Sequence, residues 1–249
     1  GGKFDTKNKA LDRFKQMIDE GADIIDIGGE STGPGSIDVT DQEEQQRISP
    51  FIKEIRKTSE AWISVDTYRA ATAKIALEAG ADMVNDVLAL RGDLEMPKII
   101  AEYNVPVVLM YSKDSTGRTT GEQRQYDDVI NHILEFFDER IKFAQSGGIK
   151  KDQIIIDPGQ GAFVSGDPKY SLQILKNLKK FDNFNLPVLI GSSRKSFIGL
   201  TSKLPIPERL EGSLACAAVA VMNGAKIIRA HDVRATRRII DMVYSIINS

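Results

Sequence analysis

The chain contains few of the residues that several kinds of site require. Its single cysteine, Cys216, excludes an internal disulfide and suits a reducing compartment. The chain has only two histidines in addition to that cysteine, too few of these ligands to favour a zinc site. No apolar run reaches the roughly 18 residues that a membrane helix needs, and we expect no signal peptide. We therefore expect a cytoplasmic location and no membrane partner.

An excess of charge of one sign is also absent. The 33 Lys and Arg residues against 35 Asp and Glu give a formal net charge of −2, so the surface as a whole does not attract nucleic acid. Any anion site must then be a local cluster of basic residues. Hydrophobic residues make up 41% of the 249 residues, enough for a sizeable core. This length is normal for one α/β barrel, although two smaller domains are possible.

Short apolar segments alternate with helical patterns along the chain. Three times a helix ends at a glycine and is followed by a short strand whose far end turns polar. Four further apolar runs of strand type lie between these, each followed by a helical pattern. The seven expected strands lie within residues 22–29, 62–66, 80–86, 105–111, 154–157, 187–190 and 224–232.

Strict alternation of apolar strands and helices predicts a parallel sheet covered on both faces. Seven such units could form an open doubly wound sheet, whereas an eighth strand would close a barrel. The sequence opens on a loop that leads into a helix, so we expect one strand and its loop to precede residue 1. Restoring that strand gives the eight of a (β/α)8 TIM barrel, and we expect residues 1–249 to form a single domain.

Residues 189–199, Leu-Ile-Gly-Ser-Ser-Arg-Lys-Ser-Phe-Ile-Gly, predict a strand, a turn and a helix. A helix start at Ser192 or Ser193 places Arg194 and Lys195 in the first turn. The helix dipole disfavours cations there unless an anion binds. Free backbone N–H groups and two cations make a receptor for phosphate or carboxylate. A solvated basic turn is the alternative reading of this stretch alone.

Polar residues also end most of the other strands: Asp26, Asp66, Asn85 with Asp86, Asp157, and Arg229 with His231. The carboxyl ends of parallel strands meet at one face, where the active sites of such folds lie. Carboxylate and amide groups suit a planar, nitrogen-rich ligand, and cationic donors suit phosphate or carboxylate. Each residue alone has an ordinary structural reading, such as the turn at Asp157. Together they predict a ligand that is heterocyclic in one half and anionic in the other.

Taken in order, these motifs resemble the dihydropteroate synthase family of pterin-binding enzymes. The resemblance runs nearly the whole length, and the pairing of Ser-Arg-Lys-Ser-Phe with Arg-x-His-Asp-Val is specific. The motifs are the segment 21–32 with Pro34-Gly35, Ser64-Val65-Asp66-Thr67, Asn85-Asp86, Asp157-Pro158-Gly159, residues 193–199 and residues 229–233.

The resemblance implies a (β/α)8 barrel and a transferase of folate biosynthesis. The family condenses 6-hydroxymethyl-7,8-dihydropterin diphosphate with 4-aminobenzoate, giving 7,8-dihydropteroate and pyrophosphate. Pyrophosphate leaves first, and the arylamine traps the pterin cation. The resemblance also implies Mg²⁺ as cofactor and a homodimer formed through the region of residues 210–222 and 239–247.

Site residues carried over from the family fall into three groups. The pterin ring would contact Asp66, Asn85, Val87, Met110, Asp157, Gly191 and Lys195. The aminobenzoate site would contain Thr32, Pro34, Phe163 and Ser196. The diphosphate would bind Arg229 and His231, which with Asp66, Asp157 and Lys195 form the expected catalytic set. The metal ligand expected from the family, an Asn in the first loop, would precede residue 1, so no metal ligand is assigned.

The chain departs from the family pattern inside the expected site as well. Gly33 stands where an Arg usually precedes the Pro, and Tyr111 replaces a His after Met110. Residues 161–164 read Gly-Ala-Phe-Val instead of Gly-Phe-Gly-Lys. With the Arg-Thr-Thr-Gly loop at 118–121, this last change is similar to the sulfonamide-insensitive variants of the family. We therefore expect this protein to discriminate against sulfonamides better than the usual member.

Two other functions fit some of the same residues. A pterin-binding methyltransferase barrel, which passes a methyl group from a folate to a corrinoid protein, would share the carboxylate and amide groups. It handles no diphosphate, so it has no need of Lys195 together with Arg229 and His231. A non-catalytic pterin-binding homologue is the second alternative, motivated by Gly33 in place of Arg.

Overall fold

The computed structural model describes residues 7–31, 33, 35–36 and 39–249. Strands and helices alternate through this part of the chain, as the sequence predicts. The strands are β1 (Ile24–Gly28), β2 (Trp62–Asp66), β3 (Met83–Asp86), β4 (Val107–Met110), β5 (Ile154–Asp157), β6 (Leu189–Ile190) and β7 (Ile227–Ile228). The α-helices are α1 (Lys7–Asp19), α2 (Asp41–Arg56), α3 (Ala70–Glu78), α4 (Met96–Tyr103), α5 (Val129–Ser146), α6 (Pro168–Lys176), α7 (Ser196–Ser202), α8 (Leu210–Met222) and α9 (Val233–Ile247).

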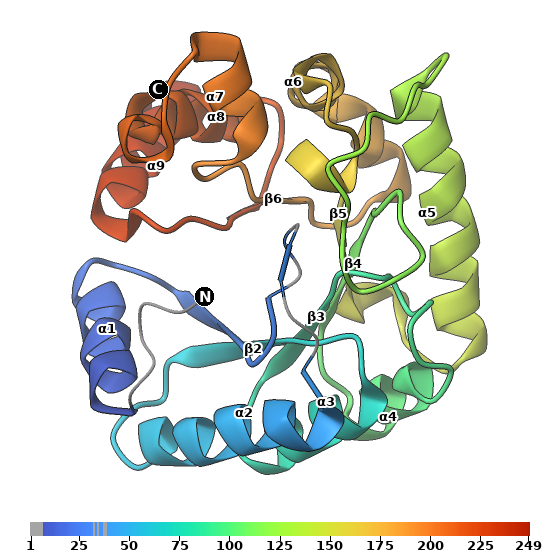
Figure 1. Ribbon diagram of the computed structural model, residues 1–249, viewed down its shortest axis with the longest axis vertical. Helices are drawn as coiled ribbons and strands as arrows, with labels where there is room; N and C mark the ends of the chain where they lie inside the picture. Colours follow the sequence, from blue (N-terminus) through green and yellow to red (C-terminus); the bar gives the residue numbers. More distant parts are fainter. Residues whose placement is uncertain (1–6, 32, 34, 37–38) are drawn as a thin grey trace.

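The strands are parallel and neighbour one another in chain order. β1 to β5 form one sheet and β6 pairs with β7, while a single bridge from Ile156 to Val188 links the two groups. Figure 1 looks down the shortest axis of the molecule and shows the strands around a central axis with the helices outside them. This is the layout of a (β/α) barrel. Within the described residues β7 and β1 are not paired, and the strand expected ahead of residue 1 stays a prediction.

The core lies on both faces of the strands, as their continuous apolar runs predict. The main cluster packs between strands and helices and extends from Phe14 to Ala225. A second, smaller cluster joins Met83, Val108 and Leu189 from β3, β4 and β6. Side chains pointing to either face of a strand are therefore removed from water, and Ile63, which is 0% exposed, is typical. The barrel interior is packed below the strand ends, which leaves the mouth for a site.

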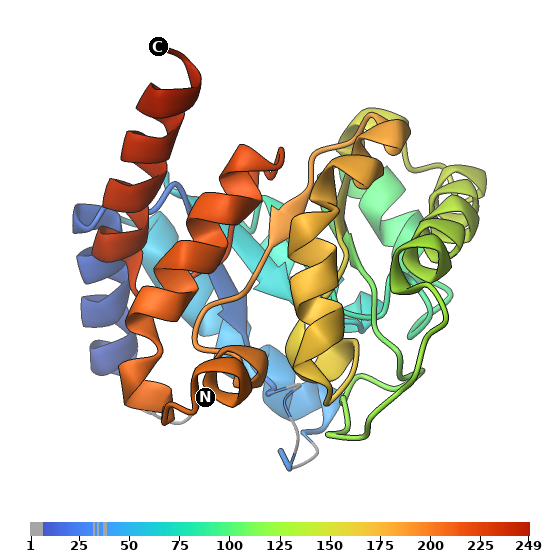
Figure 2. The same cartoon turned by 90° about the horizontal axis from the view of Figure 1, so that it is seen from above.

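One end of the barrel carries the long connections, and Figure 2 shows loops and α7 gathered there. A capping box is present at the start of α2, with the Thr40 side chain accepting from the Glu43 N–H. The loops after β1 and β4 meet at this end, because Arg118 Nη2 contacts Glu30 Oε1 at 2.8 Å. Among the described residues, no helix combines the length and apolar character needed to cross a bilayer.

The predicted helix start at Ser192 or Ser193 is wrong. α7 begins at Ser196, and the residues before it form a turn in which the Lys195 N–H donates to Ser192 O. Arg194 has a φ of +53°, a left-handed conformation that interrupts any helix. The Ser213 hydroxyl accepts the Arg194 N–H at 2.9 Å and fixes this turn. Lys195 thus occupies the position before the helix instead of its first turn.

Candidate functional site

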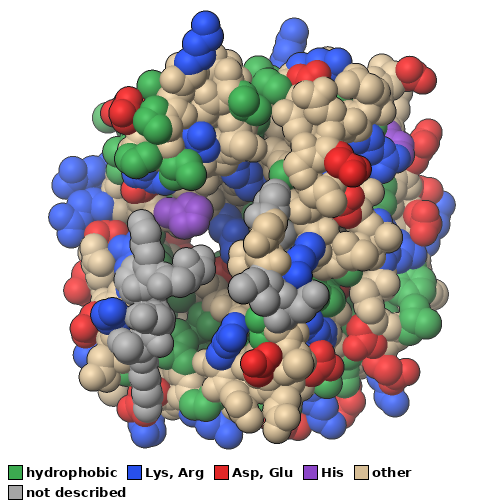
Figure 3. All heavy atoms as spheres, viewed as in Figure 1, with side chains coloured by type: hydrophobic (Ala, Val, Ile, Leu, Met, Phe, Trp, Pro, Cys, Tyr) green, Lys and Arg blue, Asp and Glu red, His purple; other side chains and the backbone are tan. Residues whose placement is uncertain are grey.

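A cavity opens among the carboxyl ends of the strands and holds about 360 Å³ of empty space, part of it open to solvent. Every residue predicted to contact the pterin ring lines it. The lining residues are Asp66, Asn85, Val87, Met110, Asp157, Phe163, Gly191, Lys195 and Arg229. The face seen in Figure 3 is hollowed near its centre, with basic side chains and a histidine around the hollow. The prediction that distant strand ends deliver polar groups to one mouth is therefore confirmed for Asp66, Asn85, Asp157, Lys195 and Arg229.

Strand register sets the acidic side of this cavity. Asp66 at the end of β2 lies opposite Asn85 of β3, and Met110 of β4 lies opposite Asp157 of β5. Asn85 and Asp157 are 6% and 5% exposed, so few of their polar atoms reach water. Asp157 Oδ1 accepts the Gly159 N–H at 2.8 Å, which is the expected turn, and burial raises the pKa of its carboxyl group. These groups are poised to bond a buried polar ligand.

Arg229 bridges two carboxylates across the part of the barrel where, within the described residues, β7 and β1 are not paired. Its Nε donates to Asp26 Oδ2 at 2.7 Å, and its Nη2 donates to Asp66 Oδ2 at 3.0 Å. Burial, and then the charge of Asp26, raise the pKa of Asp66, while the Asp26 charge raises the pKa of Arg229. The guanidinium is half exposed, so an incoming anion can reach it. The basic and acidic parts of the site are thus electrostatically joined.

Lys195 enters the cavity from the other side. Its Nζ donates to Gln160 O at 3.2 Å and lies 5.3 Å from the centre of the Phe163 ring. Burial lowers the pKa of Lys195 to about 8, and the nearby Asp157 carboxylate limits that decrease. A lysine whose pKa is near neutrality beside a buried carboxylate is a frequent feature of catalytic sites.

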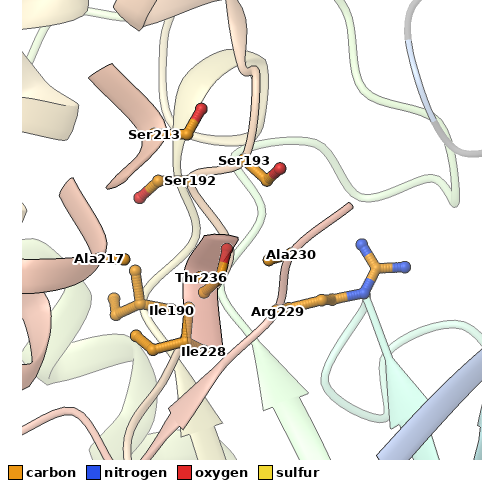
Figure 4. Close-up of a pocket in the computed structure, with 9 residues that line it drawn as sticks. All are labelled: Ile190, Ser192, Ser193, Ser213, Ala217, Ile228, Arg229, Ala230 and Thr236. Carbon is orange, nitrogen blue, oxygen red and sulfur yellow. The ribbon is translucent and has the colours of Figure 1, made fainter. Parts of the chain in front are cut away.

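A second, smaller hollow shares Arg229 with this site in its lining and holds about 230 Å³ of empty space. Figure 4 shows serine side chains around it, with the side chain of Arg229 extending away from them. His231 does not line the main cavity. Its Nδ1 lies 2.9 Å from Ser193 Oγ, and burial together with Arg229 lowers the pKa of its imidazole. Both effects favour the neutral imidazole over its charged form.

Arg194 does not offer its charge to the cavity, contrary to the prediction for a cationic turn. Its Nε and Nη2 bond the two oxygens of Asp232 at 2.7 and 2.9 Å, and its Nη1 bonds the carbonyls of Ile206 and Pro207. The left-handed backbone directs the side chain to these partners. Arg194 therefore holds α8 and α9 to the turn, which leaves Lys195 as the cation of this segment.

The residues predicted for an aminobenzoate site are only partly brought together. Phe163 lines the cavity, whereas Ser196 is exposed at the start of α7 and does not. Thr32 and Pro34 lie outside the described residues. Asp86, which also follows a strand, accepts the Leu88 and Leu90 N–H groups at 2.8 Å and shapes the turn. The ordinary structural reading holds for Asp86.

Two features of the site are missed by sequence reasoning. Gln160 is fully buried, bonds Ser192, and has an amide Nε2 with no hydrogen-bond partner within the described residues. Glu30 gathers two arginines and a tyrosine at the barrel mouth. The available signal for Glu30 was its position directly after the Gly28-Gly29 end of β1. A polar residue that follows glycines after a strand is therefore as good a candidate for a site residue as one at the strand end itself.

Asp26 is the residue that could bind a divalent cation at this site. No group of three or more His, Cys, Asp and Glu within the described residues is arranged to hold a metal. In the same residues Asp26 Oδ1 is buried and without a hydrogen-bond partner. Mg²⁺ usually takes one or two protein carboxylates together with substrate phosphates and waters. The donor set fits a cation that arrives with a phosphorylated substrate and does not fit a closed protein cage.

Comparisons with known proteins give a consistent result. The profile of the pterin binding enzyme family matches residues 1–231. A dihydropteroate synthase of Clostridium beijerinckii is 41% identical over 234 residues, which cover 94% of this chain and 83% of that protein. The Yersinia pestis dihydropteroate synthase, solved as a sulfonamide drug complex, superposes with a TM-score of 0.94 at 35% identity, covering 100% and 89% of the two chains. The Xanthomonas albilineans enzyme, solved with 4-aminobenzoic acid, gives 0.90 at 36% identity, covering 100% and 88%.

Proposed function

The chain belongs to the pterin-binding enzyme family, and from this premise we propose how its residues divide the work of the reaction. Its activity is dihydropteroate synthesis, the condensation of 6-hydroxymethyl-7,8-dihydropterin diphosphate with 4-aminobenzoate in folate biosynthesis. The observation that supports the assignment of residues is the single cavity lined by Asp66, Asn85 and Asp157 on one side and Lys195 and Arg229 on the other. One ligand can contact both kinds of group there.

The pterin ring binds at the acidic side. The carboxylates of Asp66 and Asp157 accept N–H groups of the ring, and the amide of Asn85 matches a donor–acceptor edge. Val87, Met110 and Gly191 enclose the ring, and Lys195 donates to one of its acceptor atoms. Positive charge develops on the pterin as the diphosphate leaves. Buried carboxylates stabilise that charge more strongly than water does, since the local dielectric constant is low.

The diphosphate binds at the basic side. Arg229 exchanges part of its contact with Asp26 and Asp66 for phosphate oxygens, and His231 donates from the neighbouring turn. Asp26 and the substrate's phosphates would hold Mg²⁺, and the cation would supply charge neutralisation of the leaving group. The C–O bond to the diphosphate breaks, and the electron pair leaves with pyrophosphate.

The arylamine then completes the reaction. Phe163, Ser196, Thr32 and Pro34 form its site, and the N–H groups at the start of α7 face its carboxylate. The amine lone pair forms the new C–N bond to the pterin methylene carbon, and one N–H proton is lost to solvent. The position of the Phe163 ring on the cavity wall beside Lys195 supports this role.

Pyrophosphate release by the full-length protein, with and without 4-aminobenzoate, tests this function. Release that requires the amine and yields 7,8-dihydropteroate supports the synthase. Pterin binding without turnover favours the non-catalytic homologue instead. Methyl transfer from a folate to a corrinoid protein, without pyrophosphate release, favours the methyltransferase. Either of the last two results rejects the proposed division of residues.

Activity is expected to fall in alkaline solution as Lys195 loses its proton. Its pKa of about 8 leaves the ammonium charged below that pH and neutral above it, so kcat/KM for the pterin diphosphate decreases as pH rises through about 8. The profile of kcat/KM reports the free enzyme. In Lys195→Arg the guanidinium stays protonated and the decrease disappears. An identical alkaline limb in both proteins would show that another group titrates.

Sulfamethoxazole is expected to inhibit this protein poorly. Residues 161–164 differ from the usual family pattern, and Phe163 lines the cavity where the arylamine is proposed to bind. We expect a half-inhibitory concentration at least about tenfold above that of the Clostridium beijerinckii enzyme, a difference of about 1.4 kcal/mol in binding. Both enzymes are assayed at equal ratios of 4-aminobenzoate to its KM. Equal potency would contradict the prediction.

We further propose a single domain, a homodimer and a cytoplasmic location. Val219, Met222, Met242 and Tyr244 are exposed apolar side chains of α8 and α9, and such patches mark interfaces. Sedimentation equilibrium tests the dimer, and a monomer at micromolar concentration would reject it.

The other two proposals have separate tests. A single cooperative unfolding transition is expected for a single domain, and cell fractionation tests the location.

A further inference from the structure

The loop after β4, residues 113–126, is bonded along the segment that carries Phe163. Three successive carbonyl groups of that segment lie within hydrogen-bond distance of the loop: Ala162 O of Thr119 Oγ1 (2.9 Å), Phe163 O of the Lys113 N–H (2.8 Å), and Val164 O of Tyr126 Oη (2.7 Å). Two further bonds run between the same stretches, from Ser165 Oγ to Arg124 O at 2.9 Å and from the Gly166 N–H to Glu122 O at 3.1 Å. The position of Phe163 is therefore set by the β4 loop.

Tyr111 fixes the end of this β4 loop. Its ring is 1% exposed, and its Oη lies 2.9 Å from Tyr126 Oη, which in turn bonds Val164 O. Two departures from the family pattern, Tyr111 and the segment 161–164, are thus joined through Tyr126. A histidine at residue 111 has a shorter reach than tyrosine. The changes are parts of one local structure that sets the cavity wall.

The middle of the β4 loop is attached to the loop after β1. Arg118 Nη2 donates to Glu30 Oε1 at 2.8 Å, and Arg69 Nη1 donates to Glu30 Oε2 at 2.6 Å. The Glu30 side chain is only 3% exposed, so these charges interact with little screening. Beside them Gly117 packs on Tyr68, where an added Cβ would lie 2.1 Å from a ring atom. The close approach requires glycine and fixes Arg118 over Glu30.

We propose that Arg118 and Glu30 are positioning residues for the second substrate, the arylamine, and that they act by fixing the β4 loop against the loop after β1. This rests on the proposed function. The ion pair joins two segments: the stretch that precedes Thr32 and Pro34 in the sequence, and the β4 loop, which is hydrogen-bonded to the segment of Phe163. The acids proposed for the pterin are held differently, Asp66 by Arg229 and Asp157 by the Gly159 N–H. Loss of the ion pair therefore affects the arylamine site selectively.

The test measures KM for each substrate in Arg118→Gln, Glu30→Gln and the double variant of the full-length protein. We expect each single change to raise KM for 4-aminobenzoate about fivefold or more, with KM for the pterin diphosphate within about twofold of wild type, since a coupled pair in one network loses its interaction when either partner is removed. Because Glu30 also bonds Arg69 and Tyr68, the double variant is expected to match Glu30→Gln instead of the sum of the two single effects. Arg118→Lys, which keeps the charge, should lie closer to wild type.

Exposed residues supply matched controls, Glu122→Gln in the same loop and Arg238→Gln on α9, and both should leave each KM unchanged. Equal thermal midpoints exclude misfolding. If Arg118 bound the arylamine carboxylate directly, Glu30→Gln would free it and lower KM for 4-aminobenzoate, and that result overturns the proposal. So do unchanged KM values, or equal increases for both substrates. A wild-type protein without amine-dependent turnover would instead refute the proposed function.

Discussion

Replacing Lys195 by Ala is expected to lower turnover more than about tenfold, because a charged donor lost from a buried site costs a few kcal/mol. Lys195 Nζ lies over the Phe163 ring, and Lys195 and the buried Asp157 line the same cavity and interact electrostatically. Without the ammonium group, the buried Asp157 carboxylate loses a favourable charge and its pKa rises further above its usual value. Both effects weaken the bound pterin, so kcat and affinity should fall together. Steady-state kinetics with saturating 4-aminobenzoate measures this.

The control for Lys195→Ala is Lys179→Ala, which removes an exposed lysine from the surface. This variant should retain wild-type kinetics. Turnover within about twofold of wild type in Lys195→Ala would refute the role assigned to that side chain, since the loss of a buried charge-assisted hydrogen bond exceeds that amount.

Replacing Arg229 by Ala is expected to have the largest effect on the diphosphate. The guanidinium bonds Asp26 and Asp66 and is half exposed toward the cavity. Its loss removes the cation for the leaving group and leaves two carboxylates facing each other, which repels an anion. We expect KM for the pterin diphosphate to rise about a hundredfold, as two charge-assisted hydrogen bonds at about 1.5 kcal/mol each allow.

Product inhibition separates this effect from a general loss of structure. Pyrophosphate should inhibit Arg229→Ala at least about tenfold more weakly than it inhibits wild type, because the group that binds it is gone. Arg238→Ala, an exposed change on α9, should leave the inhibition constant unchanged. An unchanged inhibition constant for pyrophosphate in Arg229→Ala would show that the diphosphate binds elsewhere.

Much of the barrel could be predicted because it depends on short-range patterns. β2 and β5 have the bounds that their apolar runs indicate, and the Thr40 capping box is formed as its spacing requires. The residues of the pterin cavity could be predicted for a topological reason: parallel strands bring Asp66, Asn85 and Asp157 to one end wherever they lie in the sequence. Neither inference needs knowledge of long-range contacts.

The features that could not be predicted depend on contacts between distant segments. Arg194 pairs with Asp232, which lies 38 residues away in the sequence. The two adjacent cations in the sequence do not predict the left-handed backbone conformation of Arg194. The Glu30–Arg118 pair joins residues 88 apart. Ion pairs of this kind depend on how the loops pack against one another. The hydrophobic periodicity of the sequence does not predict which residues will pair. The same reason explains why His231 was expected in the cavity but bonds Ser193 beside it.

A crystal structure of the full-length protein with 6-hydroxymethyl-7,8-dihydropterin diphosphate tests the central claim most directly. We predict the ring between Lys195 and the group of Asp66, Asn85 and Asp157, with the diphosphate on Arg229, whose guanidinium gives up part of its contact with Asp26. A ring bound outside this cavity would contradict the account. So would a diphosphate bound far from an Arg229 that still bridges both carboxylates.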